Sequence, residues 1–130
     1  MLRKVIEHPQ SWRDKQFRKE FRRLDRTAKE SCSKDLRELI AALTSDAHPV
    51  LDPAFRKWRP SAYRSSKIRN LIEYPLTGTM RVIVRFFEAS PEREEEVVVL
   101  VAATLSHDHA RLKRLIDRYK ASLSDTGGTE

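Results

Sequence analysis

The chain has 130 residues, with 26 lysines and arginines against 19 aspartates and glutamates, which gives a formal net charge of +7. That length suits one domain with one core; the single cysteine, Cys32, excludes an intrachain disulfide; and the longest apolar run, residues 97–103, is too short to cross a bilayer. With no apolar segment of signal-peptide length near Met1, we expect a cytoplasmic protein whose positive charge favours nucleic acid or the ribosome as a partner.

The first part of the chain predicts one strand and two helices. Leu2–Glu7 is expected to form a strand that ends before Pro9. Ser11 is expected to cap the first helix, with Asp14 as a weaker capping-box partner. A break at residues 31–33 then separates this helix from a second one, which ends before Pro49. Both helices have an apolar stripe at three- and four-residue spacings: Trp12, Phe17, Phe21, Leu24 and Ala28 in the first, and Leu36, Leu39, Ile40 and Leu43 in the second. These patterns favour an antiparallel helical hairpin lying on a sheet.

Residues 48–66 are predicted to form a loop, because three prolines interrupt them. This loop contains Phe55, Trp58 and Tyr63 among four lysines and arginines. Two interpretations are open. In the first, the aromatic rings stack on bases while the cations hold phosphates. In the second, the aromatic rings anchor the loop on the core.

Three strands are predicted next, at Lys67–Tyr74, Met80–Glu88 and Glu96–Thr104. The turns between them are short enough for an antiparallel meander. Side chains alternate between the two faces of a strand, so Lys67 and Arg69 share one face of theirs, and Arg81 and Arg85 share one face of theirs. If the helices cover the opposite face, these cations lie on a partly open surface.

A last helix is predicted from about Ser106. Its apolar stripe consists of Leu112, Leu115, Ile116, Tyr119 and Leu123. We therefore expect one α+β domain over residues 1–123, with a disordered tail at 124–130. Its architecture is an N-terminal strand, a helical hairpin packed on a mostly antiparallel sheet (β-α-α-β-β-β) and a C-terminal helix.

This order of elements resembles the RelE/ParE superfamily of toxins from bacterial type II toxin-antitoxin systems. Three segments carry the resemblance. Lys67-Ile68-Arg69 is similar to the Lys-x-Lys start of a strand in RelE-type ribonucleases, residues 78–84 are similar to the family's Gly-Tyr-Arg-Leu-Val-Tyr pattern, and residues 96–101 are similar to its apolar last strand. His107 follows where RelE-type members have a basic residue.

The resemblance implies a metal-independent endoribonuclease that cuts mRNA in the ribosomal A site and is held inactive by an acidic antitoxin protein. In that reaction the RNA's own 2′-hydroxyl attacks the adjacent phosphate. Histidine suits the proton transfers, and arginine suits the phosphorane charge. On this reading His107 or His109 is the acid or base and Arg81 stabilises the transition state, while Lys67, Arg69 and Arg85 hold the RNA backbone. Asp108 is a candidate for orienting a histidine.

Other interpretations stay open. The histidines are equally suited to capping or surface positions, and Arg81 and Arg85 to a solvated sheet face. We expect no cofactor and no metal, because there is no cysteine cluster, P-loop or dinucleotide-binding glycine pattern. The alternative functions are a ParE-like, non-catalytic inhibitor that acts by binding its target, and a basic nucleic-acid-binding protein.

Overall fold

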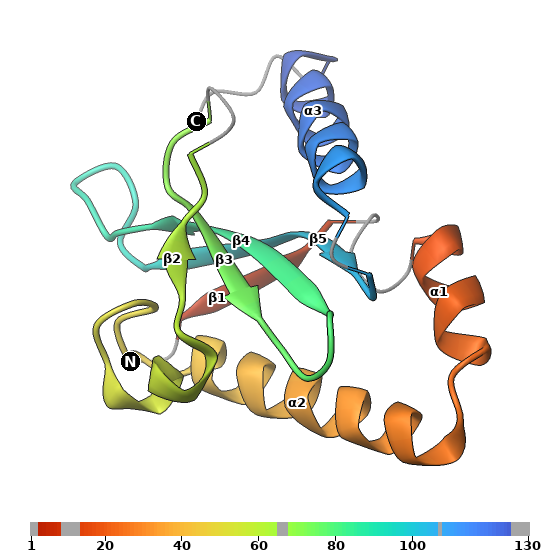
Figure 1. Ribbon diagram of the computed structural model, residues 1–130. Coiled ribbons are helices and arrows are strands. Elements are labelled where there is room, and N and C mark those ends of the chain that lie inside the picture. Colours follow the sequence, from red (N-terminus) through yellow and green to blue (C-terminus); the bar gives the residue numbers. More distant parts are fainter. Residues whose placement is uncertain (1–2, 9–13, 65–67, 107, 126–130) are drawn as a thin grey trace.

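The computed structural model of the protein describes residues 3–8, 14–64, 68–106 and 108–125. They form a five-stranded sheet with helices packed on both sides, as Figure 1 shows. The elements along the chain are β1 (Lys4–Glu7), α1 (Lys15–Arg22), α2 (Arg26–Thr44), the 3-10 helix η1 (Pro53–Trp58), β2 (Ser61–Ala62), β3 (Leu71–Pro75), β4 (Arg81–Phe87), β5 (Val97–Thr104) and α3 (His109–Asp125). The predicted α+β architecture is confirmed, including the meander of the last three long strands.

The strand order across the sheet is β1-β5-β4-β3-β2. Strand β1 pairs in parallel with β5, and all other neighbours are antiparallel. The most apolar strand, β5, lies between two others and is covered on both faces, which explains why its sequence shows no alternation of apolar and polar residues.

The register between β4 and β5 shifts by one residue in the middle of the pair. Ile83 lies opposite Ala102, but the next residue, Val84, lies opposite Leu100, so Val101 is the extra residue of a β-bulge. Because of this bulge, two successive residues, Val101 and Ala102, both contribute to the core beneath α3.

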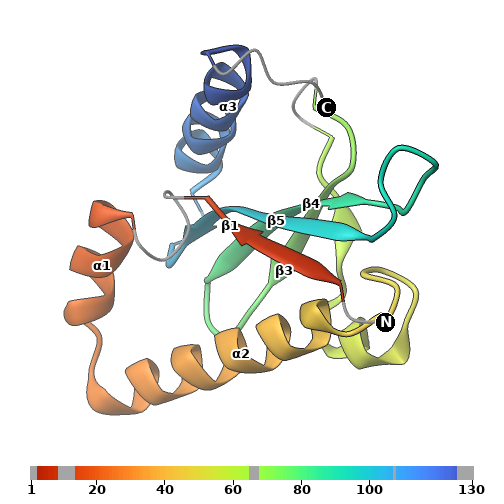
Figure 2. The same ribbon diagram turned by 180° about the vertical axis from the view of Figure 1, so that it is seen from behind.

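One core lies between the sheet and the helices α1, α2 and η1. Its fully buried members include Leu39, Leu43, Phe55, Tyr74, Val82, Val84 and Val98. Figure 2 shows α2 on one side of the sheet and α3 on the other. A second core lies beneath α3 and contains Leu71, Ile83, Val101, Ala102, Leu112, Leu115, Ile116 and Tyr119.

The second core corrects one prediction. The face of β4 that carries Arg81 and Arg85 was expected to be partly open, but Ile83, between them on this face, is fully buried under α3. The prediction was wrong because the apolar stripe of the last helix needed a partner, and the sheet supplied its second face.

The boundary between the first two helices also differs from the prediction. Ser11 lies outside the described residues, and the N-cap of α1 is Asp14, whose carboxylate accepts from the backbone N–H groups of Gln16 and Phe17. The predicted break at residues 31–33 is wrong, since α2 runs through it. The chain breaks instead before Asp25, which caps α2 by accepting from the N–H of Ala28 at 2.8 Å.

Three further boundaries were shifted. Strand β3 begins four residues later than predicted, because Asn70 takes a left-handed conformation (φ 66°) that ends regular strand geometry. The loop at 48–66 contains η1 and the short strand β2. Helix α3 continues to Asp125, two residues into the predicted tail.

Candidate functional site

Arg81 forms an ion pair that the sequence reasoning did not foresee. It is the first residue of β4, and its Nε lies 3.5 Å from Oε2 of Glu73 on the neighbouring strand β3. The Glu73 and Arg81 side chains are 19% and 16% exposed, so most of each side chain is shielded from water and a small part remains accessible. One Nη of Arg81 also donates to the carbonyl of Met80 at 2.9 Å.

Glu73 is the functional candidate that was missed. Its pairing partner on β4 is Ile83, so it lies diagonally across from Arg81 on the same face of the sheet. The alternation of side chains along a strand was the available signal, because it places Glu73 on the same face of β3 as Leu71. That face was the one predicted to carry the cations.

The start of α3 lies at the same end of the sheet as Arg81. Thr104, the last residue of β5, is the pairing partner of Arg81. The hydroxyl of Thr79, in the turn before β4, donates to the carbonyl of Leu105 at 2.7 Å, which ties that turn to the connection leading into α3. His109 is exposed in the first turn of the helix. His107 lies outside the described residues.

Asp108 caps α3. Its carboxylate accepts from the N–H of Arg111 at 3.1 Å, and its carbonyl accepts from the N–H of Leu112 at 3.0 Å. In the structure this carboxylate therefore has a capping role. Its predicted role of orienting a histidine stays a prediction.

A second ion pair fixes the start of α3 against α1. Arg111 donates through Nη2 to Oδ2 of Asp14 at 2.8 Å, and both side chains are about 15% exposed (15% and 14%). Asp14 therefore serves as N-cap of one helix and as counter-ion of the other. Through this contact, the first turn of α3 has a fixed position relative to the sheet and to α1.

Arg69 and Arg85 lie at the opposite end of β4. Arg85 is only 1% exposed, and its Nε donates to the carbonyl of Arg69 at 3.1 Å. Its guanidinium also lies 4.8 Å from the centre of the Phe87 ring. In this position Arg85 supports the local backbone and does not face solvent, so the structure does not present it to an RNA phosphate.

Arg69 itself is exposed, and Lys67 lies outside the described residues. Arg69 belongs to a bend before β3, so the expected alternation of cations along a strand is wrong at this point. The six predicted site residues thus do not form one cluster. Arg81 and His109 lie at one end of the sheet, Arg69 and Arg85 at the other, and no position is described for His107 and Lys67.

A groove of about 1030 Å³ opens at the Arg69 end. Its lining comes from the loop after α2, from β2 and the residues that follow it, from β3 and the bend before it, and from the end of β4 with its following turn: Val50, Ala62, Tyr63, Arg64, Ile68, Arg69, Asn70, Leu71, Ile72, Phe86, Phe87, Glu88 and Arg93. A smaller, apolar groove of about 320 Å³ lies between α1 and α2 and is lined by Phe17, Arg18, Phe21, Arg22, Ser33 and Leu36.

The aromatic residues of the loop at 48–66 divide between the two interpretations. Phe55 and Trp58 are buried in the first core, as expected for loop anchors. Tyr63 is half-buried: it packs against the second core and also lines the larger groove. Of these three rings, only that of Tyr63 has a part exposed in the groove, where a base could stack.

Burial shifts the pKa values of Tyr74, His8 and Cys32. Burial raises the pKa of Tyr74, whose hydroxyl donates to the carbonyl of Pro49 at 2.7 Å. Burial lowers the pKa of His8, whose ring packs edge-on against Tyr119 at 5.2 Å. Burial, and then the charge of Asp35, raise the pKa of the Cys32 thiol.

Within the described ranges, no three histidine, cysteine or acidic side chains gather as a metal site would require. Nor does any helix there combine the length and the apolar character needed to cross a membrane. Comparisons of the chain with protein-family models, curated proteins and solved structures found no match. Function is therefore inferred from the residues and their geometry.

Proposed function

We propose that the protein is the toxin of a type II toxin-antitoxin system and a ribosome-dependent mRNA endoribonuclease. The proposed nuclease chemistry is supported by the Glu73–Arg81 ion pair, which lies at the end of the sheet where His109 begins α3. A carboxylate, a guanidinium and an imidazole are the groups that metal-free RNA cleavage uses. The toxin part is supported by the order of strands and helices, which is the order on which the resemblance to the RelE/ParE superfamily rests.

In the proposed reaction the 2′-oxygen of one nucleotide attacks the phosphorus that follows it, and the bond to the 5′-oxygen of the next nucleotide breaks. A base removes the 2′-proton, an acid protonates the 5′-oxygen, and the products are a 2′,3′-cyclic phosphate and a 5′-hydroxyl. Arg81 would bind the phosphorane, whose negative charge exceeds that of the ground-state phosphate.

The proton transfers would be shared between Glu73 and a histidine of the α3 start. Glu73 lies next to Arg81, so a phosphate held by that guanidinium brings the 2′-hydroxyl close to the carboxylate. His109, and His107 two residues before it in the sequence, are candidates for the acid, since histidine is the side chain that most often transfers protons in catalysis.

Primer extension on an mRNA translated in a cell-free system tests this proposal. The wild-type protein should create new, codon-phased 5′ ends. Arg81→Gln, Glu73→Gln and His109→Gln should each lower the yield of these ends by about a hundredfold or more, the usual contribution of a charge-stabilising or proton-transferring group. Arg118→Ala, which removes an exposed arginine on the outside of α3, is the matched control and should cut normally. If the wild-type protein produces no new ends, the proposal is wrong.

A non-catalytic inhibitor is the second candidate. It is favoured by the ion pair itself, because Glu73 already neutralises Arg81 in the free protein, and by the burial of Arg85. A protein of this kind would inhibit growth without cutting RNA, and the three variants above would remain toxic. Inhibition of DNA gyrase supercoiling by the purified chain would support a ParE-like action.

The proposed antitoxin is an acidic protein that is partly disordered when free. The apolar groove between α1 and α2, flanked by Arg18 and Arg22, has the chemistry to receive an amphipathic acidic helix. An adjacent open reading frame that encodes a small acidic protein would support this part of the proposal.

A further inference from the structure

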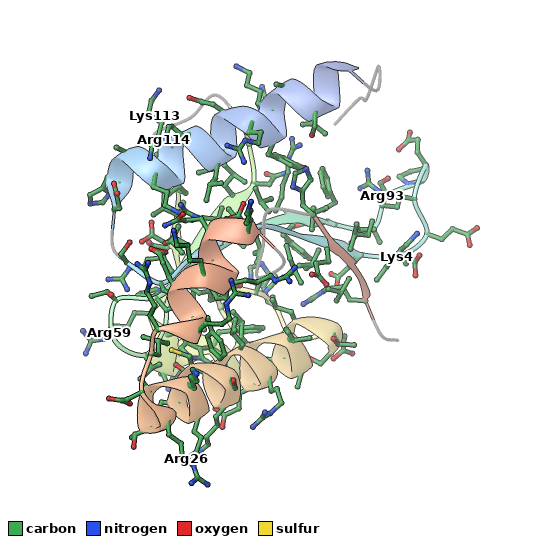
Figure 3. All side chains as sticks on the ribbon, turned by 90° about the vertical axis from the view of Figure 1, so that its right-hand side faces the viewer. Lys4, Arg26, Arg59, Arg93, Lys113 and Arg114 are labelled. Atoms are coloured by element: carbon green, nitrogen blue, oxygen red, sulfur yellow. The ribbon has the colours of Figure 1, made fainter. Side chains whose placement is uncertain are left out.

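The groove at the Arg69 end of the sheet concentrates positive charge from three separate segments. Arg64 follows β2, Arg69 precedes β3, and Arg93 lies in the turn between β4 and β5. Glu88 is the one carboxylate among the described lining residues. Figure 3 shows Arg93 at the opposite end of the molecule from Lys113 and Arg114, which lie near the start of α3. Arg81 lies at the end of the sheet where α3 starts, so the charge of the groove is separate from the site around Arg81.

The backbone that presents Arg69 is held in place by a left-handed corner and by hydrogen bonds from β4. Asn70 has a φ of 66°, in the left-handed region, which asparagine enters more readily than most residues other than glycine. Two bonds from β4 hold this corner: Arg85 donates to the carbonyl of Arg69 at 3.1 Å, and the N–H of Phe86 donates to the carbonyl of Asn70 at 3.1 Å. Arg69 is therefore presented from a backbone position that is fixed before a ligand binds.

Arg93 is also fixed before any ligand arrives. Its guanidinium lies 4.8 Å from the centre of the Phe87 ring, and one Nη donates to the carbonyl of Glu88 at 3.3 Å. An arginine already held in place loses little conformational entropy when it binds an anion, which raises the affinity of the site.

The shape and lining of the groove match an extended polyanion with flat rings. A volume of about 1030 Å³ is at the upper end of the range for small-molecule pockets, about 300–1000 Å³, so there is room for a segment of a chain. Guanidinium groups bind phosphate through two parallel bonds, and the half-buried ring of Tyr63 offers a surface on which a base can stack.

We propose that the groove lined by Arg64, Arg69, Arg93 and Tyr63 binds a single-stranded RNA segment, with the arginines on successive phosphates and Tyr63 against a base. The choice of RNA rests on the proposed function, since it makes this groove the part of the substrate site that lies away from the cleaved bond. Tyr63 distinguishes the proposal from an acidic-peptide site, because a peptide carboxylate gains nothing from a stacking ring.

Fluorescence anisotropy with a labelled, fully 2′-O-methylated oligouridine tests the proposal, because this RNA can be bound but lacks the attacking hydroxyl. Arg64→Ala, Arg69→Ala and Arg93→Ala should each raise Kd by about fivefold to tenfold, and Tyr63→Leu by about tenfold. Each arginine lost from a phosphate should also reduce the slope of log K against log salt by about 0.7. The controls are Arg56→Ala and Arg118→Ala, which remove exposed arginines outside the groove. Both should have the same salt slope as the wild-type protein.

The outcomes separate this inference from the proposed function. Tight binding of the methylated RNA by a protein that cuts no mRNA supports the groove and contradicts the nuclease. Wild-type affinity in the triple arginine variant overturns the groove, whatever the protein cuts. Failure of the wild-type protein to bind this RNA, or equal competition by polyglutamate at matched charge, also overturns it.

Discussion

The ion pair between Asp14 and Arg111 makes a sharp prediction about what holds the start of α3 in place. Asp14 performs two tasks, since it caps α1 and pairs with Arg111 at 2.8 Å. Asp14→Asn keeps the cap, because asparagine is as good an N-cap as aspartate, and removes only the charge. Asp14→Ala removes both.

The free energies of unfolding can be estimated from the geometry. Loss of the cap costs about 1 kcal/mol. Loss of the ion pair costs about 1–3 kcal/mol, because the Arg111 guanidinium then stays largely buried with no carboxylate beside it; its Nε already has no hydrogen-bond partner in the described parts of the chain. We therefore expect Asp14→Asn to cost about 1–3 kcal/mol and Asp14→Ala about 2–4 kcal/mol.

Urea unfolding followed by circular dichroism measures both variants. A double-mutant cycle with Arg111→Met should give a coupling energy of about 1 kcal/mol or more. Arg26→Met is a matched control, since Arg26 forms a pair with Glu30 that is highly exposed and should contribute little. A coupling energy near zero, or Asp14→Asn as stable as wild type, would refute the reasoning.

Three other substitutions test separate parts of the structure. Tyr74→Phe leaves the Pro49 carbonyl without its buried donor and should lower the free energy of unfolding by about 1–3 kcal/mol in urea titrations. Burial lowers the pKa of His8, so the stability it contributes is complete above its ordinary pKa of 6.5 and is lost as the pH falls below it; His8→Phe should become more stable relative to wild type at acid pH, and an unchanged difference would contradict this. Thr104→Val removes a fully buried hydroxyl that has no hydrogen-bond partner among the described residues, and should raise the melting temperature; a lower one would show that the hydroxyl is satisfied.

Much of the fold was predictable from hydrophobic periodicity. The strands β4 and β5 and the stripe of α3 differ from their predicted positions by few residues, because each has a pattern that only one secondary structure can bury. The break between α1 and α2 was harder to locate. Ser31-Cys32-Ser33 has weak helix formers, yet Cys32 is buried against the core, and tertiary packing outweighed local propensity.

The candidate site was less predictable, for two physical reasons. Alternation along a strand assigns side chains to a face, but it does not say which face a later helix covers, and α3 covered the one with Arg85. The alternation also stops at Asn70, whose left-handed conformation moves Arg69 off the strand. Glu73 could have been found, since its parity in β3 puts it on the same face as Arg81.

The role of the RNA 2′-hydroxyl is the central chemical claim, and one measurement tests it most directly. Ribosomes are programmed with an mRNA that carries a single 2′-deoxynucleotide immediately before the mapped cleavage position, and the protein is added. We predict that the all-ribose mRNA is cut to a 2′,3′-cyclic phosphate and a 5′-hydroxyl, while the deoxy-substituted mRNA stays intact. Cleavage of the deoxy-substituted mRNA at the same position would contradict the account.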